Sequence, residues 1–300
     1  MYLKKEKEKK RAKRFRALAQ THPCLSCGSA PNNKGRVHLP VSAACNIQCR
    51  FCQRACNACD DRPGVANGIL QAEEADAIVE KALALCPELT VVGVAGPGDS
   101  LASPHALEAF RRVHAKYPEL IMCMSTNGLA LPGKIPELQA VGVKTITVTV
   151  NAVDPVILEK IVSHIVYGGR LLCGAEAGEI LIRNQLRGIR EASDAGIIVK
   201  VNTVLIPGVN DEHIASIARE IADAGAMLHN ILPLIPQHEL RDIPAPTCQQ
   251  INDARAKAGE YIQQFLHCKH CRADACGIPG QSDLSSQLYD GKAMETFSHG

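Results

Sequence analysis

The chain has 300 residues, of which 46% are apolar, and a formal net charge of +2. Aromatic residues make up only 3% and Trp is absent, so stacking surfaces for bases are scarce and we expect no nucleic-acid partner. No apolar run is long enough for a transmembrane helix, so we expect no membrane partner either. The fourteen cysteines lie in tight groups, which favours metal ligands in a reducing compartment over disulfides and predicts a cytoplasmic protein.

The chain begins with a strongly basic segment. Residues 1–16 carry nine Lys or Arg and two Glu, with almost no apolar stripe. This pattern favours a solvated helix over a docking arm for an acidic partner. We therefore treat residues 1–21 as a basic N-terminal tail that precedes the folded domain, which we expect to span residues 22–266.

A Cys-x2-Cys knuckle follows at Cys24 and Cys27, and His22 offers an additional nitrogen ligand. Its spacing is compatible with half of a zinc site that Cys56 and Cys59 complete. It is equally compatible with a contribution to an iron–sulfur site. Spacing alone leaves both interpretations open.

The next motif is a cysteine triad in the loop after the strand-like run 37–41. Cys45, Cys49 and Cys52 follow a Cys-x3-Cys-x2-Cys pattern, which can hold three corners of a [4Fe–4S] cube and leave the fourth iron open. A zinc knuckle is the alternative, but structural zinc sites have four closed ligands. The pattern resembles that of radical S-adenosylmethionine (SAM) enzymes, in which SAM chelates the open iron. Phe51 is the aromatic residue that usually precedes the last cysteine.

The rest of the chain alternates between helix-like and strand-like segments. Continuous apolar strands separated by helices predict a parallel sheet that is covered on both faces. Counting the first strand, six such units predict an α/β fold, a partial (β/α)6 TIM-like barrel of the radical SAM type. The expected strands are 89–95, 120–125, 145–150, 197–205 and 227–232. The expected helices are 71–85, 104–116, 134–141, one beginning at 155, 179–195, 211–224 and 247–266.

Polar and glycine residues follow several of these strands. In parallel barrels the carboxyl ends of the strands build the active site. Glycine also lets the backbone approach a ligand closely. We therefore expect SAM to be bound by Phe51, Gly96, Gly98, Asp99, Asn127, Asn151 and Asn202.

The last motif lies beyond the final helix, in a C-terminal segment, residues 267–300, that we expect to fold back over the barrel mouth. It contains Cys268-x2-Cys271, followed by Cys276. Cys123, near the end of the third strand, is their expected distant partner. Three isolated cysteines are expected to be buried structural thiols: Cys86, Cys173 and Cys248.

Together these motifs resemble the NifB family in its short, stand-alone form, over residues 22–280. The resemblance is carried by Cys45-Asn-Ile-Gln-Cys49-x2-Cys52, Arg62-Pro-Gly-Val, Ala95-Gly-Pro-Gly-Asp99, Thr126-Asn-Gly128 and Cys268-x2-Cys271-Arg-Ala-Asp-Ala. It implies a radical SAM maturase of the nitrogenase cofactor, which fuses two [4Fe–4S] clusters into an eight-iron precursor. The precursor would hold a carbide from the methyl group of one SAM and an added sulfur, and a second SAM would supply the 5′-deoxyadenosyl radical.

The same resemblance implies three [4Fe–4S] clusters, one that binds SAM and two auxiliary ones. Their auxiliary ligands would come from His22, Cys24, Cys27, Cys56, Cys123, Cys268 and Cys271. Candidates for catalysis are His38, Asp60 and Arg62, and Asp60 stands where the family has Glu. The implied partners are an iron–sulfur cluster donor, a low-potential electron donor such as a ferredoxin or flavodoxin, and carrier or scaffold proteins of nitrogenase maturation.

Two other functions compete with this interpretation. The first is a radical SAM enzyme with permanent auxiliary clusters that modifies a peptide or a small organic substrate. The second is an iron–sulfur carrier or a zinc protein without enzymatic activity. The predicted barrel disfavours the second, because a carrier needs no such fold.

Overall fold

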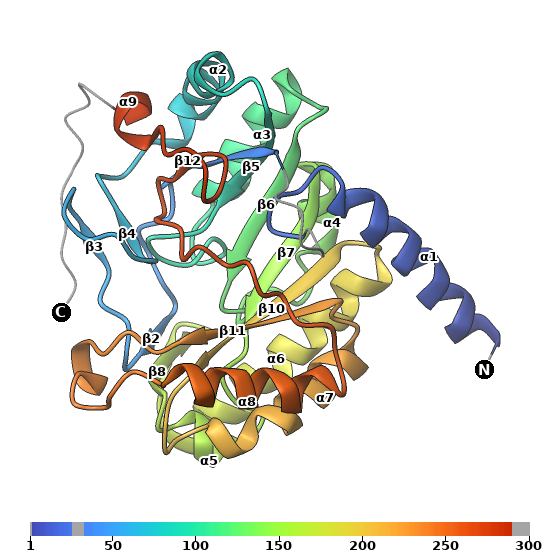
Figure 1. The fold of residues 1–300 in the computed structure, drawn as a ribbon, viewed down its shortest axis with the longest axis vertical. Coiled ribbons are helices and arrows are strands. Elements are labelled where there is room, and N and C mark those ends of the chain that lie inside the picture. The colour runs from blue at the N-terminus through green and yellow to red at the C-terminus, as the bar shows by residue number, and fades with distance from the viewer. Residues whose placement is uncertain (1, 26–32, 290–300) are drawn as a thin grey trace.

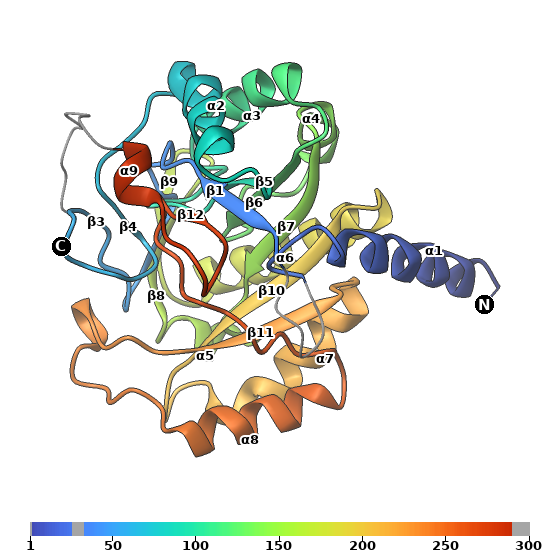
Figure 2. The same cartoon turned by 45° about the horizontal axis from the view of Figure 1, so that its top comes forward.

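A curled seven-stranded sheet forms the centre of the computed structural model, which describes residues 2–25 and 33–289. The strand order is β11-β10-β7-β6-β5-β1-β12. All neighbours are parallel except the last pair, β1 and β12. The sheet forms a half-barrel and confirms the predicted partial barrel of six parallel strands (Figures 1 and 2). The strands are β1 Gly35–His38, β5 Leu89–Val94, β6 Ile121–Thr126, β7 Val143–Thr149, β10 Ile198–Leu205, β11 Leu228–Pro233 and β12 Cys276–Gly277.

Helices cover the outer face of this sheet (Figure 1). Their apolar residues recur at helical spacing, as in α7, where Ile214, Ile217, Ala218 and Ile221 are all buried. That helix ends at Gly225, whose φ of 106° lies in the left-handed region that glycine adopts readily. The helices are η1 Ala72–Glu74, α2 Ala75–Leu85, α3 His105–Lys116, α4 Ile135–Ala140, α5 Pro155–Leu158, α6 Gly174–Asp194, η2 Asp211–His213, α7 Ile214–Ala224, η3 His238–Leu240, α8 Cys248–Gly259 and α9 Ser285–Tyr289.

Three predicted boundaries were wrong by several residues. The helix expected at 179–195 is α6, which begins at Gly174. The first strand ends at His38 rather than at residue 41, because Pro40 has no N–H to donate and the chain turns there. The last long helix, α8, ends at Gly259 rather than at residue 266. After this poor helix former the chain runs beside β11 instead, where His229 N–H donates to the Gln263 carbonyl over 2.9 Å.

Two of the three isolated cysteines were also predicted wrongly. Cys86 is buried as expected, but Cys173 and Cys248 are exposed. Cys173 is the residue before α6, and Cys248 is the first residue of α8. Both helices begin at the surface, where the first turn leaves its side chains in solvent.

A small sheet absent from the predictions holds the triad loop. β2 (Ile47–Cys49) pairs with β8 (Val162–Tyr167), which pairs with β9 (Arg170–Leu172). The β8–β9 hairpin turns at Gly168 and Gly169, whose φ angles are 59° and 75°. Such paired positive angles match the twist of two-residue hairpins. Part of the triad loop is therefore a strand, fixed by backbone hydrogen bonds. A shorter pair, β3 (Ala55–Cys56) and β4 (Val65–Ala66), follows the triad.

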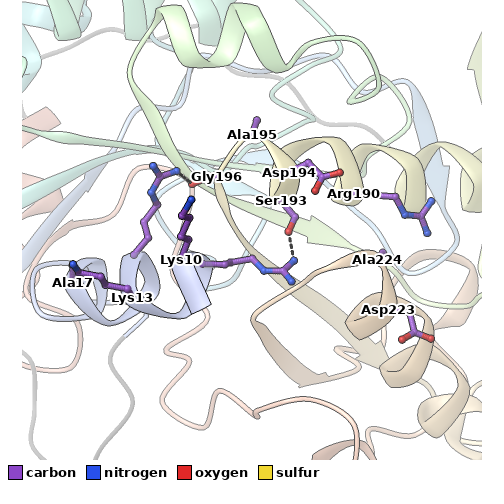
Figure 3. Close-up of a pocket in the computed structure, with 12 residues that line it drawn as sticks. Lys10, Lys13, Ala17, Arg190, Ser193, Asp194, Ala195, Gly196, Asp223 and Ala224 are labelled. Atoms are coloured by element: carbon purple, nitrogen blue, oxygen red, sulfur yellow. Dashed lines mark hydrogen bonds between the residues drawn. The ribbon is translucent and has the colours of Figure 1, made fainter. Parts of the chain in front are cut away.

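The basic N-terminal segment forms α1 (Tyr2–Ala19), which projects from the barrel (Figures 1 and 2). Its described lysines are exposed, but Phe15 is buried. The Arg11 guanidinium donates to Ser193 Oγ and to the Gly225 carbonyl, and Arg14 donates to the Gly196 carbonyl (Figure 3). The helix is thus tied to loops at the amino ends of β10 and β11. Within the described ranges no helix is long and apolar enough to cross a membrane.

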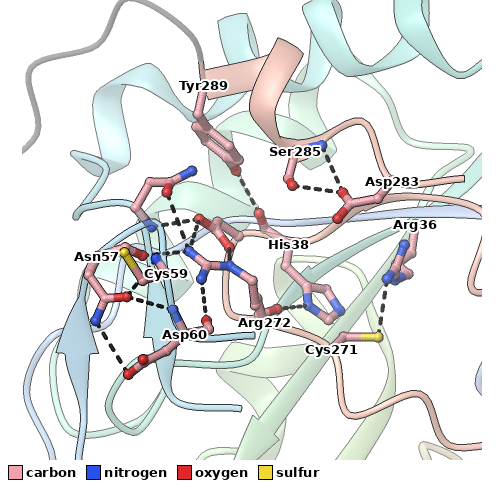
Figure 4. A network of polar contacts seen from close by, with 12 residues as sticks. Arg36, His38, Asn57, Cys59, Asp60, Cys271, Arg272, Asp283, Ser285 and Tyr289 are labelled. Carbon is pink, nitrogen blue, oxygen red and sulfur yellow. Dashed lines mark hydrogen bonds and ion pairs between the residues drawn. The ribbon is translucent and has the colours of Figure 1, made fainter. Parts of the chain in front are cut away.

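The segment that carries the terminal cysteines is bound to the start of the barrel. Arg272 forms an ion pair with Asp274, with 2.9 Å between Nε and Oδ1, and the Asp274 side chain is only 1% exposed. The Asn67 N–H donates to Asp274 Oδ2 over 2.6 Å, and Arg272 Nη2 donates to the Asn57 carbonyl over 2.9 Å. These contacts join residues 271–277 to the loop after the triad (Figure 4).

We expect the substitution Asp274→Ala to lower the free energy of unfolding by about 3–5 kcal/mol, because it leaves the Arg272 charge buried without its partner. Equilibrium unfolding in denaturant measures this loss. Asp242, whose side chain is 93% exposed beside Arg241, is the matched control, and Asp242→Ala should stay within about 0.5 kcal/mol of wild type. Equal effects of the two substitutions would contradict a structural role for the buried pair.

Candidate functional site

The half-barrel encloses a cavity of about 340 Å³ on the inner face and at the carboxyl ends of the strands. The structure brings together here most of the residues singled out from the sequence. These are Cys24, His38, Cys45, Cys49, Phe51, Cys52, Gly98, Asp99, Cys123, Asn127, Asn151, Asn202, Cys268 and Cys271. A larger depression of about 930 Å³ beneath α1 is lined by neither Cys nor His and lies at the opposite end of the strands (Figure 3).

The triad forms one wall of the cavity. Cys49 ends β2, and the Gln48 side chain donates to the carbonyls of Cys49 and Cys52, which fixes the turn between them. Burial raises the pKa of Cys45 to about 11 and also raises the pKa values of Cys49 and Cys52. Arg54, which lines the cavity, opposes this rise. Three partly buried thiols beside one cation fit the ligand set of an iron–sulfur cluster, which binds thiolates and displaces their protons.

The loops after β5 and β6 form hydrogen bonds with the triad loop. The Asn127 amide donates to Asn46 Oδ1 over 2.7 Å, next to Cys45. Asp99 accepts hydrogen bonds from the backbone N–H of Asn127 over 2.5 Å and from the Thr126 hydroxyl. Its other oxygen accepts from the Leu101 N–H over 2.9 Å. Asp99 therefore links the loops after β5 and β6. Both of its carboxylate oxygens accept hydrogen bonds from described residues.

A second group of thiols lies deeper in the half-barrel. Cys24, Cys123 and Cys271 come from the segment after α1, from β6 and from the C-terminal segment, and all three line the cavity. Burial raises the pKa of Cys24 to about 11, and the neighbouring Cys271 and Cys123 add to the rise. Arg36 Nη2 donates to Cys271 Sγ over 3.1 Å. Cys123 and the terminal motif thus line one cavity, and their joint role as ligands stays a prediction.

His38 presents one ring nitrogen without a hydrogen-bond partner among the described residues. Its Nδ1 lies 3.0 Å from the Arg272 carbonyl, which only accepts, so Nδ1 carries the proton and Nε2 keeps its lone pair. Burial lowers the pKa of His38 to about 4, so the ring is neutral. Gly93 leaves room for the ring, since a Cβ there would lie 2.8 Å from His38 Cδ2. A histidine oriented by a backbone carbonyl is the usual arrangement of a metal ligand.

His22 differs, because both of its ring nitrogens have partners. Nδ1 accepts from the Cys24 N–H over 3.1 Å, and Nε2 lies 3.1 Å from Thr145 Oγ1. Burial lowers its pKa to about 3. In this structure His22 holds the segment that positions Cys24 and does not line the cavity.

The comparisons with known proteins agree with this arrangement. Residues 39–221 match the model of the Radical SAM superfamily. The FeMo cofactor biosynthesis protein NifB of Methanocaldococcus infernus is 43% identical over 284 residues, 94% of this chain and 93% of the relative. That of Methanocaldococcus jannaschii is 41% identical over 97% of this chain and 100% of the relative.

The chain belongs to the NifB family.

Membership in the radical SAM superfamily makes the chain a radical SAM enzyme and implies a [4Fe–4S] cluster and SAM as cofactors. The NifB protein of Klebsiella pneumoniae is longer, since the 40% identical match covers 93% of this chain and 61% of that relative. Streptococcus suis SuiB shares the fold with a TM-score of 0.54, at 11% identity over 87% of this chain and 53% of that one.

Besides His22, five residues expected at the site do not line the cavity or lie outside the described residues. Cys27 falls in the undescribed segment 26–32. Cys56 is buried in β3 and does not line the cavity. Asp60 pairs with Arg62 over 3.0 Å in the loop beyond the triad. Gly96 also lies off the cavity, while Arg62 lines a smaller adjoining one of about 240 Å³ together with Phe51 and Cys52.

Sequence reasoning missed the cations around the thiols. Lys200 and Arg54 line the cavity, and Arg36 contacts Cys271. One signal was available, because Lys200 interrupts an otherwise apolar stretch of β10. A charged residue in a strand that is buried on both faces requires a compensating partner.

Gly98 lines the cavity, where its expected approach to SAM stays a prediction, and it also contacts the triad loop. Its N–H donates to the Ser42 carbonyl over 2.6 Å, and a Cβ at this position would lie 2.1 Å from the Ala44 carbonyl oxygen. Gly98→Ala should therefore displace the loop that precedes Cys45 and lower the amount of iron bound by the triad.

Iron and sulfide content and 5′-deoxyadenosine formation, measured after anaerobic reconstitution, test this. Gly259→Ala is the control, because the nearest atom to a Cβ there is 4.0 Å away. Wild-type iron content and SAM cleavage in Gly98→Ala would refute a role for this contact in holding the triad.

Proposed function

We propose that this protein fuses two [4Fe–4S] substrate clusters into the eight-iron precursor of the nitrogenase cofactor. One SAM would supply a methyl group that becomes the central carbide, a second would supply the 5′-deoxyadenosyl radical, and an outside source would add one sulfur. The observation that carries this proposal is the presence of two groups of partly buried thiols in one cavity. A site for SAM cleavage alone needs only the first group. Membership in the NifB family supports the same conclusion.

In this proposal the triad holds the resident [4Fe–4S] cluster, which, when bound, supplies the electron for reductive cleavage of SAM. Cys45, Cys49 and Cys52 bind three of its corners. Arg54 offsets the charge of the three thiolates, and the loops after β5 and β6 keep their backbone in place. Asn151 and Asn202 line the cavity beside the triad and offer polar groups to SAM.

The second group of thiols binds substrate. Cys24, Cys123 and Cys271 hold one substrate cluster, and His38 offers Nε2 to iron from the edge of the same space. Three thiolates leave a corner of a cube open, and such incomplete ligation allows the fused product to leave. Further ligands are predicted among Cys27, Cys56 and Cys268, and His22 acts by holding Cys24 in position. Asp60 and Arg62, which pair in the loop beyond the triad, are candidates for catalysis.

In this proposal three segments of the chain have different roles. Residues 1–21 form a basic tail, residues 22–266 form the catalytic barrel, and residues 267–300 close the substrate site. Because the clusters, the electron and the product must pass between proteins, the proposal requires three kinds of partner. These are a cluster donor, a low-potential electron donor such as a ferredoxin or flavodoxin, and carrier or scaffold proteins of nitrogenase maturation.

Replacing Cys45, Cys49 and Cys52 together by Ala tests the first half of the proposal. The variant should lose about four irons and all formation of 5′-deoxyadenosine, because SAM cleavage requires the triad cluster. The substrate clusters should persist, since their ligands lie on other segments. Iron analysis and product chromatography of the anaerobic protein measure both effects. Continued formation of 5′-deoxyadenosine would exclude the radical SAM role of the triad.

A single turnover distinguishes cluster fusion from a radical SAM reaction with permanent auxiliary clusters. With SAM and reductant, the EPR signals of the substrate clusters should disappear as an eight-iron species forms. The double variant Cys123→Ala/Cys271→Ala should bind about four fewer irons, still cleave SAM, and form no such species. If the auxiliary signals of the wild type survived complete SAM cleavage, the permanent-cluster alternative would be correct.

A further inference from the structure

Lys200 is a buried cation that the proposed reaction has not yet used. It is the third residue of β10, where it pairs with Thr147 of β7 on one side and with Leu228 of the edge strand β11 on the other. The residue is only 8% exposed, and its side chain lines the cavity. A lysine at such a position normally has an anionic partner, because burying an isolated ammonium is costly.

No carboxylate fills this role in the described part of the chain. Neither an ion pair nor a hydrogen bond from Lys200 Nζ is formed there, and the contact that is formed is with the Phe265 ring, 4.9 Å from Nζ to the ring centroid. A cation over an aromatic face is favourable but recovers only part of the cost of burial. The ammonium therefore faces the cavity without a counter-charge from the described protein.

Lys200 lines the same cavity as the three thiols of the second group. Lys200 lowers the pKa values of Cys24 and Cys123 against the larger effect of burial, which raises both. It also lowers the pKa values of His22 and His38, so its charge reaches both histidines at this end of the cavity. Deprotonated thiols and the sulfides of a bound cluster would supply the anion that Lys200 lacks.

The triad offers a parallel arrangement. Arg54 is 9% exposed, lines the same cavity and lowers the pKa values of the triad cysteines against burial. Each group of thiols thus has a buried cation beside it, and the second group also has Arg36, which donates to Cys271 Sγ. Buried cations beside both groups of thiols are explained more simply by two anionic ligands than by packing alone.

We propose that Lys200 binds the substrate cluster held by Cys24, Cys123 and Cys271 and acts as its counter-charge. This inference rests on the proposed function, because it requires a cluster at these three cysteines. A positive charge beside an iron–sulfur cluster favours its reduced form and raises its reduction potential. It also slows loss of the cluster, because the bound anion replaces the partner that Lys200 otherwise lacks.

The test uses the full chain, reconstituted with iron and sulfide and studied without SAM. Lys200→Met keeps the length and packing of the side chain but removes its charge. The midpoint potential of the substrate-cluster EPR signal should shift to more negative values, and iron should be lost to a chelator roughly 10-fold faster. The triad signal should stay at the wild-type potential.

Two controls separate charge from structure. Lys200→Arg restores the cation and should return both readouts close to wild type. Lys144→Met removes an exposed lysine from neighbouring β7 and should change neither. Thermal unfolding of all variants identifies a change caused by misfolding. A wild-type midpoint potential and a wild-type rate of iron loss in Lys200→Met would overturn the assignment.

A triple variant, Cys24→Ala/Cys123→Ala/Cys271→Ala, separates failure of this inference from failure of the proposed function. It should lose the substrate-cluster signal that Lys200→Met shifts. If the triple variant kept the full iron content and that signal, the placement of the cluster would be wrong, and so would the role of Lys200. If it lost the signal while Lys200→Met behaved as wild type, only the role of Lys200 would be wrong.

Discussion

The free edge of the first strand is the constraint on which the rest of the site depends. A half-barrel of six parallel strands does not close on itself, so β1 would expose unpaired backbone groups at the edge nearest the cysteines. The chain covers this edge with its own C-terminal segment, as β12 pairs antiparallel with β1. The His38 N–H donates to the Ala275 carbonyl over 2.8 Å, which continues the pairing beyond the two strands. Covering the edge is therefore also what carries Cys271 into the cavity.

The same pairing sets the chemistry of His38. Because Arg272 is held by Asp274 and by backbone carbonyls of the loop after the triad, its own carbonyl is fixed opposite His38 Nδ1. That contact selects the tautomer with a free Nε2, and burial keeps the ring neutral. Residues 271–277 thus cover the edge of the sheet, position the Cys271 thiol and orient the His38 ring. Loosening this segment would alter all three together.

The fold was largely predictable from the sequence, whereas the contents of the cavity were only partly so. Apolar strands alternating with amphipathic helices are local patterns, and they predicted the barrel with errors mainly at helix and strand ends. β12 was missed because it pairs with a strand distant in sequence, and two residues carry too little pattern to indicate a strand. The β8–β9 hairpin has a local signal, two glycines between two strands, which the prediction did not use. The apolar residues around Lys200 in β10 indicated its burial, but its neighbour Phe265 comes from a distant segment and could not be identified from spacing along the chain.

On the proposed function, the buried cations would also explain how one cavity binds and then releases an anionic substrate. While the cavity holds no cluster, burial keeps Cys24 protonated at neutral pH, with a pKa of about 11. Lys200 would then be a buried charge without an anionic partner among the described residues, and an incoming cluster would relieve that cost as the thiols give up their protons. When the product leaves, Cys24 would take up its proton again, and Lys200 would lack an anionic partner until the next cluster binds.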